Sequence, residues 1–204
     1  MTKRWFAAKS GSDPATPPSG DSYAYKASLV GSAMTFELTA DGLAWRVGRK
    51  SGVWPYQDIA AIRLSYRPVS MQSRRFRADI VSKTGERVVL LSTSWQTVAL
   101  VAPQDQEYRA FIFALHRRLA AAGGDVTLTG GLGPRTYAVS VAFLAVVIIA
   151  LAGLLARAVA TAQYGGMLFI VGFAALFGWQ IGGFIRRNKP RRYSFDALPL
   201  GLLP

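Results

Sequence analysis

Two long uncharged runs near the end of the sequence constrain the fold more than any other feature. Residues 136–156 contain no charged side chain, and after Arg157 a second uncharged run extends over 158–185. An α-helix rises about 1.5 Å per residue, so roughly 20 apolar residues span the hydrocarbon core of a bilayer. Helices of soluble proteins usually keep a polar stripe, and the first run has none. The two runs therefore predict a pair of transmembrane helices.

A break in the second run sets the helix boundaries. Polar and turn-forming residues gather at 157–166, where the pair Gly165–Gly166 favours a turn. We therefore expect a transmembrane hairpin over 136–186, with helices at about 136–157 and 166–186. Both ends of such a hairpin lie on the same side of the membrane.

Small residues spaced four apart in the second helix predict close helix packing. This spacing places small side chains along one side of a helix and lets a neighbouring backbone approach. The contact is expected within the hairpin or, alternatively, between two copies of the chain. The helix-packing residues are Ala174, Gly178 and Gly182.

The charges that flank the two runs predict the orientation in the membrane. Eight Lys or Arg residues lie on the outer flanks, whereas the loop between the runs offers only Arg157. Basic flanking residues favour the cytoplasmic side. We therefore expect a multi-pass protein of a bacterial inner membrane with both termini in the cytoplasm.

The remaining sequence divides into a tail, a domain and a second tail. Residues 1–22 are rich in Ser, Gly and Pro and predict a disordered N-terminal tail, in which Trp5 and Phe6 could touch a membrane surface. Residues 23–130 predict a cytoplasmic domain. Residues 187–204 predict a basic, proline-rich cytoplasmic tail, whose apolar end either packs on the domain or binds a partner.

Short alternating runs predict antiparallel strands in the first part of the domain. The dipeptide Asp41–Gly42 between two apolar runs is typical of a β-hairpin. Residues 58–67 alternate between apolar and polar, and residues 76–91 do so on both sides of a turn at 83–86. A further strand is expected near 97–101. One face of this sheet should be apolar and the other wet.

The period then changes to that of a helix. One apolar stripe is formed by Tyr108, Phe111, Ile112, Leu115 and Leu119, at spacings of three and four. Glycines at 123–124 predict the end of this helix. His116, a single imidazole without a predicted partner, is expected at the surface or rim. A curved sheet or partial barrel with the helix over one open end would bury the stripe and cover the strand edges.

This order of elements resembles a known class of proteins. The segment VWPYQDIAAI at 53–62 and the helix YRAFIFALHRRLAAAG at 108–123 are similar to bacterial membrane proteins that carry a pleckstrin-homology-like domain beside a pair of transmembrane helices. The resemblance covers about residues 25–186. It implies an α+β fold, with a pleckstrin-homology-like antiparallel β-barrel and a C-terminal capping helix, followed by a transmembrane two-helix hairpin.

An arginine-rich stretch lies between two predicted strands. Residues 63–77 read RLSYRPVSMQSRRFR, with five arginines and no acid. Because alternate residues of a strand face opposite sides, the strand arginines lie opposite the apolar residues and gather on one outer surface. We predict a lipid-binding site formed by Arg63, Arg67, Arg74, Arg75 and Arg77.

Three interpretations of this cluster compete. Arginine binds phosphate through paired hydrogen bonds, and each basic residue near an anionic membrane contributes about 1 kcal/mol, which favours anionic lipids of the inner leaflet. A solvated basic face is the alternative. A nucleic-acid partner is not expected, because stacking rings are needed on the basic face and Tyr66 and Phe76 alternate onto the core side.

The chain offers little material for catalysis. It has no cysteine, one histidine and 11 acidic residues against 24 basic ones, for a formal charge of +13. No arrangement typical of a nucleophile, a carboxylate pair, a phosphate loop or a metal site is present. We therefore expect no enzymatic activity, no catalytic residue, no metal and no cofactor.

These observations predict a non-enzymatic integral inner-membrane protein. Its cytoplasmic domain would bind or orient on anionic lipid or on a protein partner, which could be another membrane protein or a second copy. The alternative is an accessory structural subunit of a larger bacterial membrane complex.

Overall fold

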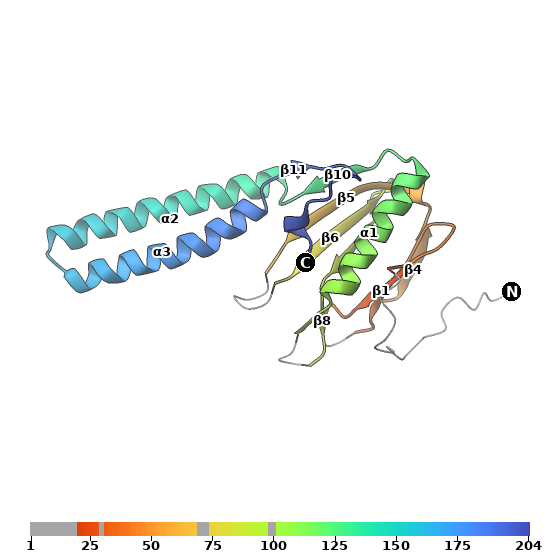
Figure 1. Ribbon diagram of the computed structural model, residues 1–204. Coiled ribbons are helices and arrows are strands. Elements are labelled where there is room, and N and C mark those ends of the chain that lie inside the picture. Colours follow the sequence, from red (N-terminus) through yellow and green to blue (C-terminus); the bar gives the residue numbers. More distant parts are fainter. Residues whose placement is uncertain (1–19, 29–30, 69–73, 98–100) are drawn as a thin grey trace.

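The computed structural model describes residues 20–28, 31–68, 74–97 and 101–204. A domain of strands and one helix carries two long helices, which extend from it side by side (Figure 1). The tail predicted to be disordered at 1–22 lies outside the described residues as far as residue 19.

The first sheet is a four-stranded antiparallel meander in the order β1-β2-β3-β4. Its strands are β1 (Ser22–Tyr25), β2 (Met34–Leu38), β3 (Leu43–Val47) and β4 (Lys50–Trp54). The hairpin predicted at Asp41–Gly42 is confirmed, because Leu38 pairs with Leu43 across it. The Thr39 amide closes the turn by donating to the Gly42 carbonyl at 2.9 Å.

The second sheet has five strands in the order β11-β10-β5-β6-β7. They are β5 (Ile59–Tyr66), β6 (Phe76–Ser82), β7 (Arg87–Leu91), β10 (Thr127–Gly130) and β11 (Arg191–Arg192). The 3-10 turn η1 (Tyr56–Asp58) precedes β5. The turn predicted at 83–86 is confirmed, since the Ser82 amide donates to the Glu86 carbonyl at 2.9 Å.

One neighbour pair in this sheet is parallel. β10 runs parallel to β5, whereas an antiparallel sheet was expected. Parallel neighbours need a crossover connection, and the helix α1 (Asp105–Ala122) lies between β5 and β10 in the sequence. Both strands therefore point toward the same end of the sheet.

A third, two-stranded sheet precedes α1. It pairs β8 (Thr93–Trp95) with β9 (Val101–Pro103). The strand expected near 97–101 falls partly at 98–100, which lie outside the described residues, and the observed strand begins at Val101.

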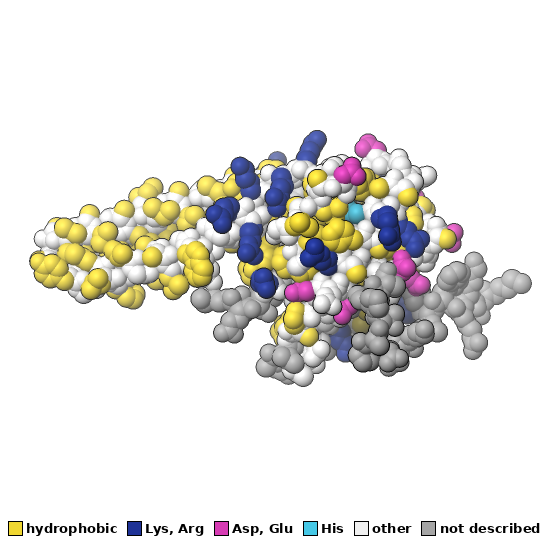
Figure 2. Space-filling view, in the orientation of Figure 1, with side chains coloured by type: hydrophobic (Ala, Val, Ile, Leu, Met, Phe, Trp, Pro, Cys, Tyr) yellow, Lys and Arg dark blue, Asp and Glu magenta, His cyan; other side chains and the backbone are white. Residues whose placement is uncertain are grey.

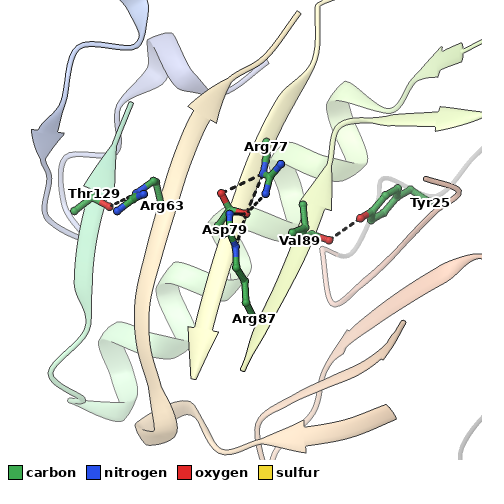
Figure 3. A network of polar contacts seen from close by, with 7 residues as sticks. All are labelled: Tyr25, Arg63, Arg77, Asp79, Arg87, Val89 and Thr129. Atoms are coloured by element: carbon green, nitrogen blue, oxygen red, sulfur yellow. Dashed lines mark hydrogen bonds and ion pairs between the residues drawn. The ribbon is translucent and has the colours of Figure 1, made fainter. Parts of the chain in front are cut away.

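The fold is mixed α and β, as expected, but the strands of the described residues do not close into a barrel. Between β1 and β7, side chains take the place of strand pairing. The Tyr25 hydroxyl donates to the Val89 carbonyl at 2.6 Å (Figure 3). The Tyr23 hydroxyl donates to the Leu91 carbonyl. The tyrosines satisfy edge carbonyls that a further strand would otherwise bind.

The apolar stripe of α1 forms the centre of the core. Its five predicted residues are all inaccessible to solvent and pack with apolar side chains from the first two sheets. The helix ends where predicted, and Gly123 adopts a φ of +65°, a left-handed conformation that glycine tolerates.

The surface position expected for His116 is wrong, because its side chain is only 2% exposed. Nδ1 lies 2.7 Å from the Ile112 carbonyl oxygen, and Nε2 lies 3.0 Å from the Tyr193 hydroxyl. A carbonyl only accepts, so Nδ1 carries the proton and Nε2 accepts from Tyr193. Burial lowers the pKa of His116. The C-terminal segment covers this side of α1.

We expect the stability of the domain to fall below about pH 6.5 because of His116. The pKa of His116 is lower in the folded chain than in the unfolded chain. As the pH falls, the unfolded chain is therefore protonated first, and this protonation favours unfolding. Chemical denaturation of the whole chain in detergent at pH 7.5 and 5.5 measures this loss. His116→Gln should shrink the difference between the two pH values, and an undiminished difference would contradict the assignment.

The C-terminal segment returns to the domain. After β11 it forms the 3-10 turn η2 (Leu200–Leu202), and Leu202 and Leu203 are buried in the core. The Arg109 guanidinium donates to the Pro204 carbonyl at 3.2 Å. Of the two expectations for this apolar end, packing on the domain is the one observed.

The C-terminal helical pair consists of α2 (Pro134–Ala160) and α3 (Tyr164–Arg187). Both helices are long and apolar enough to cross a membrane, and their most apolar windows are 0% and 6% buried. The turn lies at residues 161–163. The turn role expected for Gly165–Gly166 is wrong, because both glycines belong to the first turn of α3.

Candidate functional site

The hairpin and the second sheet share a hydrogen-bonded joint. β10 leads into α2 through residues 131–133, and α3 leads into β11 through residues 188–190. The Gly131 amide donates to the Leu64 carbonyl at 2.7 Å, and the Leu132 amide donates to the Asn188 carbonyl at 2.9 Å. The C-terminal end of β5 therefore lies at the base of the hairpin.

Asn188 is the central side chain of this joint and is fully buried. Its Oδ1 accepts from the Tyr66 amide at 3.0 Å, and its Nδ2 donates to the Tyr66 carbonyl at 2.9 Å and to the Phe184 carbonyl at 3.2 Å. The side-chain amide thus pairs with the edge of β5 where β10 has ended. The Arg187 guanidinium lies 5.1 Å from the centre of the Tyr66 ring, within the range of a cation–π contact.

The main chain packs tightly at the same point. Gly131 has a φ of +88°, and an added Cβ would lie 2.5 Å from the carbonyl oxygens of Asn188 and Lys189. No larger residue fits there without moving backbone atoms. Close packing and hydrogen bonds therefore connect the domain directly to the base of the hairpin.

The strand arginines share the outer face of the second sheet, as alternation predicts. In the register of β5 and β6, Arg63 lies directly opposite Asp79. Two positions further along, Ser65 lies opposite Arg77, on the same face of the sheet. The Arg67 amide donates to the Arg75 carbonyl at 2.8 Å, which continues the pairing beyond the end of β5. Directly opposed residues of antiparallel strands lie on the same face.

Arg77 differs from the other predicted site residues because an acid neutralises it. Its guanidinium binds Asp79 with a shortest N–O distance of 2.7 Å, and the Nε of Arg87 donates to the same carboxylate at 3.0 Å (Figure 3). The Asp79 carboxylate is buried, so both ion pairs are partly shielded from water. Sequence reasoning did not include Arg87, which lies on the third strand of this group.

Arg63 lies on the β10 side of the sheet, beside the start of the hairpin, because its Nη1 is 3.5 Å from the position of a Cβ added at Gly133, the residue before α2. Arg67 lies four positions further along the chain, or roughly 13 Å away at 3.3 Å per residue. The Arg63 Nε donates a long hydrogen bond of 3.4 Å to the Thr129 hydroxyl on β10 (Figure 3). The predicted cluster therefore divides into three parts: Arg63 beside β10 and Gly133, Arg77 in its ion pair with Asp79, and three arginines beyond the paired ends of β5 and β6.

We call these three residues, Arg67, Arg74 and Arg75, the base cluster. Burial lowers the pKa of Arg67, and the charge of Arg77 lowers it further. Burial likewise lowers the pKa of Arg75, with added effects of Arg77 and Arg67. The positive charges of Arg67, Arg75 and Arg77 therefore lie close together, while the nearby Asp79 is already bound by Arg77 and Arg87. A bound anion would reduce the repulsion between these arginines.

More basic residues lie at the end of α3 and directly after it, at the base of the hairpin. Arg186 and Arg187 form its last turn, and Lys189, Arg191 and Arg192 come directly after it. Figure 2 shows dark blue side chains in a band where the apolar hairpin meets the domain. The base cluster is part of a larger basic region around the joint.

The predicted helix-packing residues Ala174, Gly178 and Gly182 all belong to α3. Ala174 and Gly178 line a shallow apolar cleft between α2 and α3. An added Cβ at Gly178 or Gly182 would meet no atom within 4 Å outside its own helix. These glycines leave open surface on the hairpin.

In the part of the chain that the structure describes, no group of three or more His, Asp or Glu side chains could hold a metal ion. Comparisons with known protein families, curated proteins and solved structures find no match to the chain. The candidate site is therefore defined by its geometry: the apolar hairpin, the joint and the basic region around it.

Proposed function

We propose that this chain is a non-enzymatic integral membrane protein whose domain is held against anionic lipid headgroups by its own transmembrane hairpin. The observation that carries the proposal is that two exposed apolar helices emerge through a hydrogen-bonded joint from the basic end of a sheet. The joint places the base cluster next to the point where the hairpin would enter the membrane.

The exposure of the hairpin supports membrane insertion. Val139, Ile149 and Leu168 are 69%, 71% and 78% exposed, and neighbouring apolar side chains extend this surface along both helices. Apolar surface in water costs roughly 25 cal/mol per Å², and soluble monomers rarely expose large continuous patches. A helix also satisfies its own backbone hydrogen bonds, as the hydrocarbon core requires.

The basic region supports the orientation that we propose. Basic residues flank the base of the hairpin, whereas its turn holds only Arg157 nearby. Lipid-facing basic residues favour the cytoplasmic leaflet, and each contributes about 1 kcal/mol. We propose that the domain and both termini are cytoplasmic and that the membrane is a bacterial inner membrane.

We also propose that the domain is related to pleckstrin-homology-like modules. The succession of two antiparallel meanders, β1–β4 and β5–β7, followed by α1 supports this relation. In this proposal the domain binds lipid headgroups or a protein partner at the membrane surface and performs no reaction.

The open glycines of α3 favour a second candidate function. Gly178 and Gly182 leave room for another helix, as in a subunit of a larger membrane complex or in a homodimer. Size measurement after mild detergent extraction separates these states. A discrete monomer supports the first proposal, a discrete dimer supports the homodimer, and co-migration with a large assembly supports a subunit of a larger complex.

We expect the full chain, reconstituted in bilayers, to prefer spin-labelled phosphatidylglycerol over spin-labelled phosphatidylcholine. Replacing both Arg67→Gln and Arg74→Gln should reduce this preference by up to about thirtyfold, since each cation contributes about 1 kcal/mol and the two together about 2 kcal/mol. Both arginines are exposed, and neither forms an ion pair with an acid among the described residues. The fraction of motionally restricted lipid, measured by electron spin resonance, gives the preference.

The matched control removes two other exposed cations by Arg49→Gln and Lys83→Gln. Arg49 lies in the β3–β4 turn, and Lys83 lies in the β6–β7 turn at the end of the sheet away from the hairpin. This variant should retain the lipid preference. No preference in the unmodified chain, or equal losses in both variants, would overturn the proposed lipid contact.

A further inference from the structure

A groove crosses the outer face of α1, on the opposite side of the helix from the core. Its floor is formed by Ala110, Phe113, Ala114 and Ala120, and its far wall is formed by residues 195–198 and Leu200 of the C-terminal segment. Outside the hairpin, three large hydrophobic residues are exposed among the described residues, and two of them, Phe113 and Leu200, line this groove. In Figure 2, exposed hydrophobic side chains lie beside the histidine in this region.

The chain enters the described structure at the edge of this groove. Gly20 is buried against α1, and an added Cβ would lie 2.8 Å from the Ala110 carbonyl oxygen and 3.3 Å from the Ala114 Cβ. Arg118 binds Asp21 at 3.1 Å and fixes the next residue on the same side of the helix. The N-terminal and C-terminal segments thus flank α1 on opposite sides, with the groove between them.

We propose that the N-terminal segment, residues 1–19, binds across this groove and inserts the aromatic pair Trp5 and Phe6 into it. This segment has two aromatic side chains, and the groove floor consists mainly of small alanines that leave room for rings. Burial of an aromatic side chain provides a large apolar contact area. The inference is independent of the proposed membrane function.

The tether is long enough for this contact. Residues 7–19 separate Phe6 from Gly20, and an extended chain of that length spans up to about 45 Å. The 18 residues of α1 are about 27 Å long. A short tether also holds the segment near the groove at an effective concentration of the order of millimolar, which favours this occupant over a second copy.

Disulfide trapping tests the proposal, because the natural chain contains no cysteine. The test pair is Ala7→Cys with Ala197→Cys, which joins the segment to an exposed residue lining the groove. The control pair is Ala7→Cys with Val53→Cys, since Val53 is an exposed residue of β4. Both full-length variants are oxidised mildly in dilute detergent solution, and intramolecular crosslinking is followed with time.

We expect the test pair to crosslink at least fivefold faster than the control pair. Adding Trp5→Ser and Phe6→Ser to the test pair should remove most of this advantage. Equal rates for the two pairs, crosslinks formed only between chains, or a rate unchanged by the serine substitutions would each overturn the proposal.

Discussion

Gly42→Ala is expected to destabilise the domain by about 3 kcal/mol or more. A Cβ at this position would lie 2.1 Å from the Trp54 carbonyl oxygen and 2.7 Å from its carbon, closer than at any other described glycine. Gly42 also has a φ of +150°, a conformation that alanine adopts with strain. The obstructing atoms are backbone, so either the β2–β3 turn or the end of β4 must move.

Gly85→Ala is the matched control for this prediction. Gly85 also has a positive φ, of +86°, but an added Cβ meets nothing within 4 Å. Only the left-handed conformation is penalised there, at about 1 kcal/mol. Chemical denaturation of the full chain in detergent, followed by tryptophan fluorescence, compares the two. Similar losses for both variants would contradict the close approach to Trp54.

Local sequence signals predict the elements that depend on neighbouring residues. The Asp41–Gly42 turn, the apolar stripe of α1 and the uncharged helical pair all follow from spacing or composition over short windows. The contact between Gly42 and Trp54 does not, because it depends on how β3 returns beside β4. Gly42 is therefore needed for two reasons: the sequence predicts its role in the turn, but its close approach to Trp54 depends on the tertiary structure.

Local sequence signals could not predict the contacts made by the C-terminal end of the chain. β11 contains two residues and β10 contains four, too few for a periodic pattern. Their pairing brings the C-terminal segment over α1, which buries His116 against Tyr193. The incorrect surface assignment of His116 arose because helical spacing describes only the face toward the sheet.

The candidate site was predictable in part. Strand alternation correctly placed Arg63, Arg67 and Arg77 on the outer face of the sheet, but it could not show that Arg77 is paired with Asp79. Asn188 was missed altogether. An asparagine after the last turn of a helix suggests a local cap, yet its partner Tyr66 lies 122 residues away in the sequence.

The joint distinguishes this molecule from a domain on a flexible tether. A flexible linker would let the domain rotate, and the screened charges of the base cluster would have to orient it. Here Asn188 and Gly131 connect the sheet to both helices by hydrogen bonds and close packing. In our proposal the hairpin therefore sets the height of the base cluster, and the arginines select the lipid.

Asn188→Ala is expected to lower the free energy of unfolding by about 3 kcal/mol and to loosen the domain from the hairpin. The substitution removes three hydrogen bonds and leaves the partly buried amide and carbonyl of Tyr66 without partners, each at a cost of about 1–3 kcal/mol. Denaturation measures the first effect. Spin labels at Lys83→Cys and Ala160→Cys, one on the domain and one at the far end of α2, measure the second through their distance distribution.

Gln163→Ala serves as the control, because Gln163 is exposed in the turn at the other end of the hairpin. The unmodified chain and this control should both give a narrow distribution, whereas Asn188→Ala should broaden it. A distribution that stays narrow without Asn188 would mean that packing around Gly131 alone fixes the domain. A broad distribution in the unmodified chain would contradict a rigid joint, and the base cluster would then have no fixed height above the membrane.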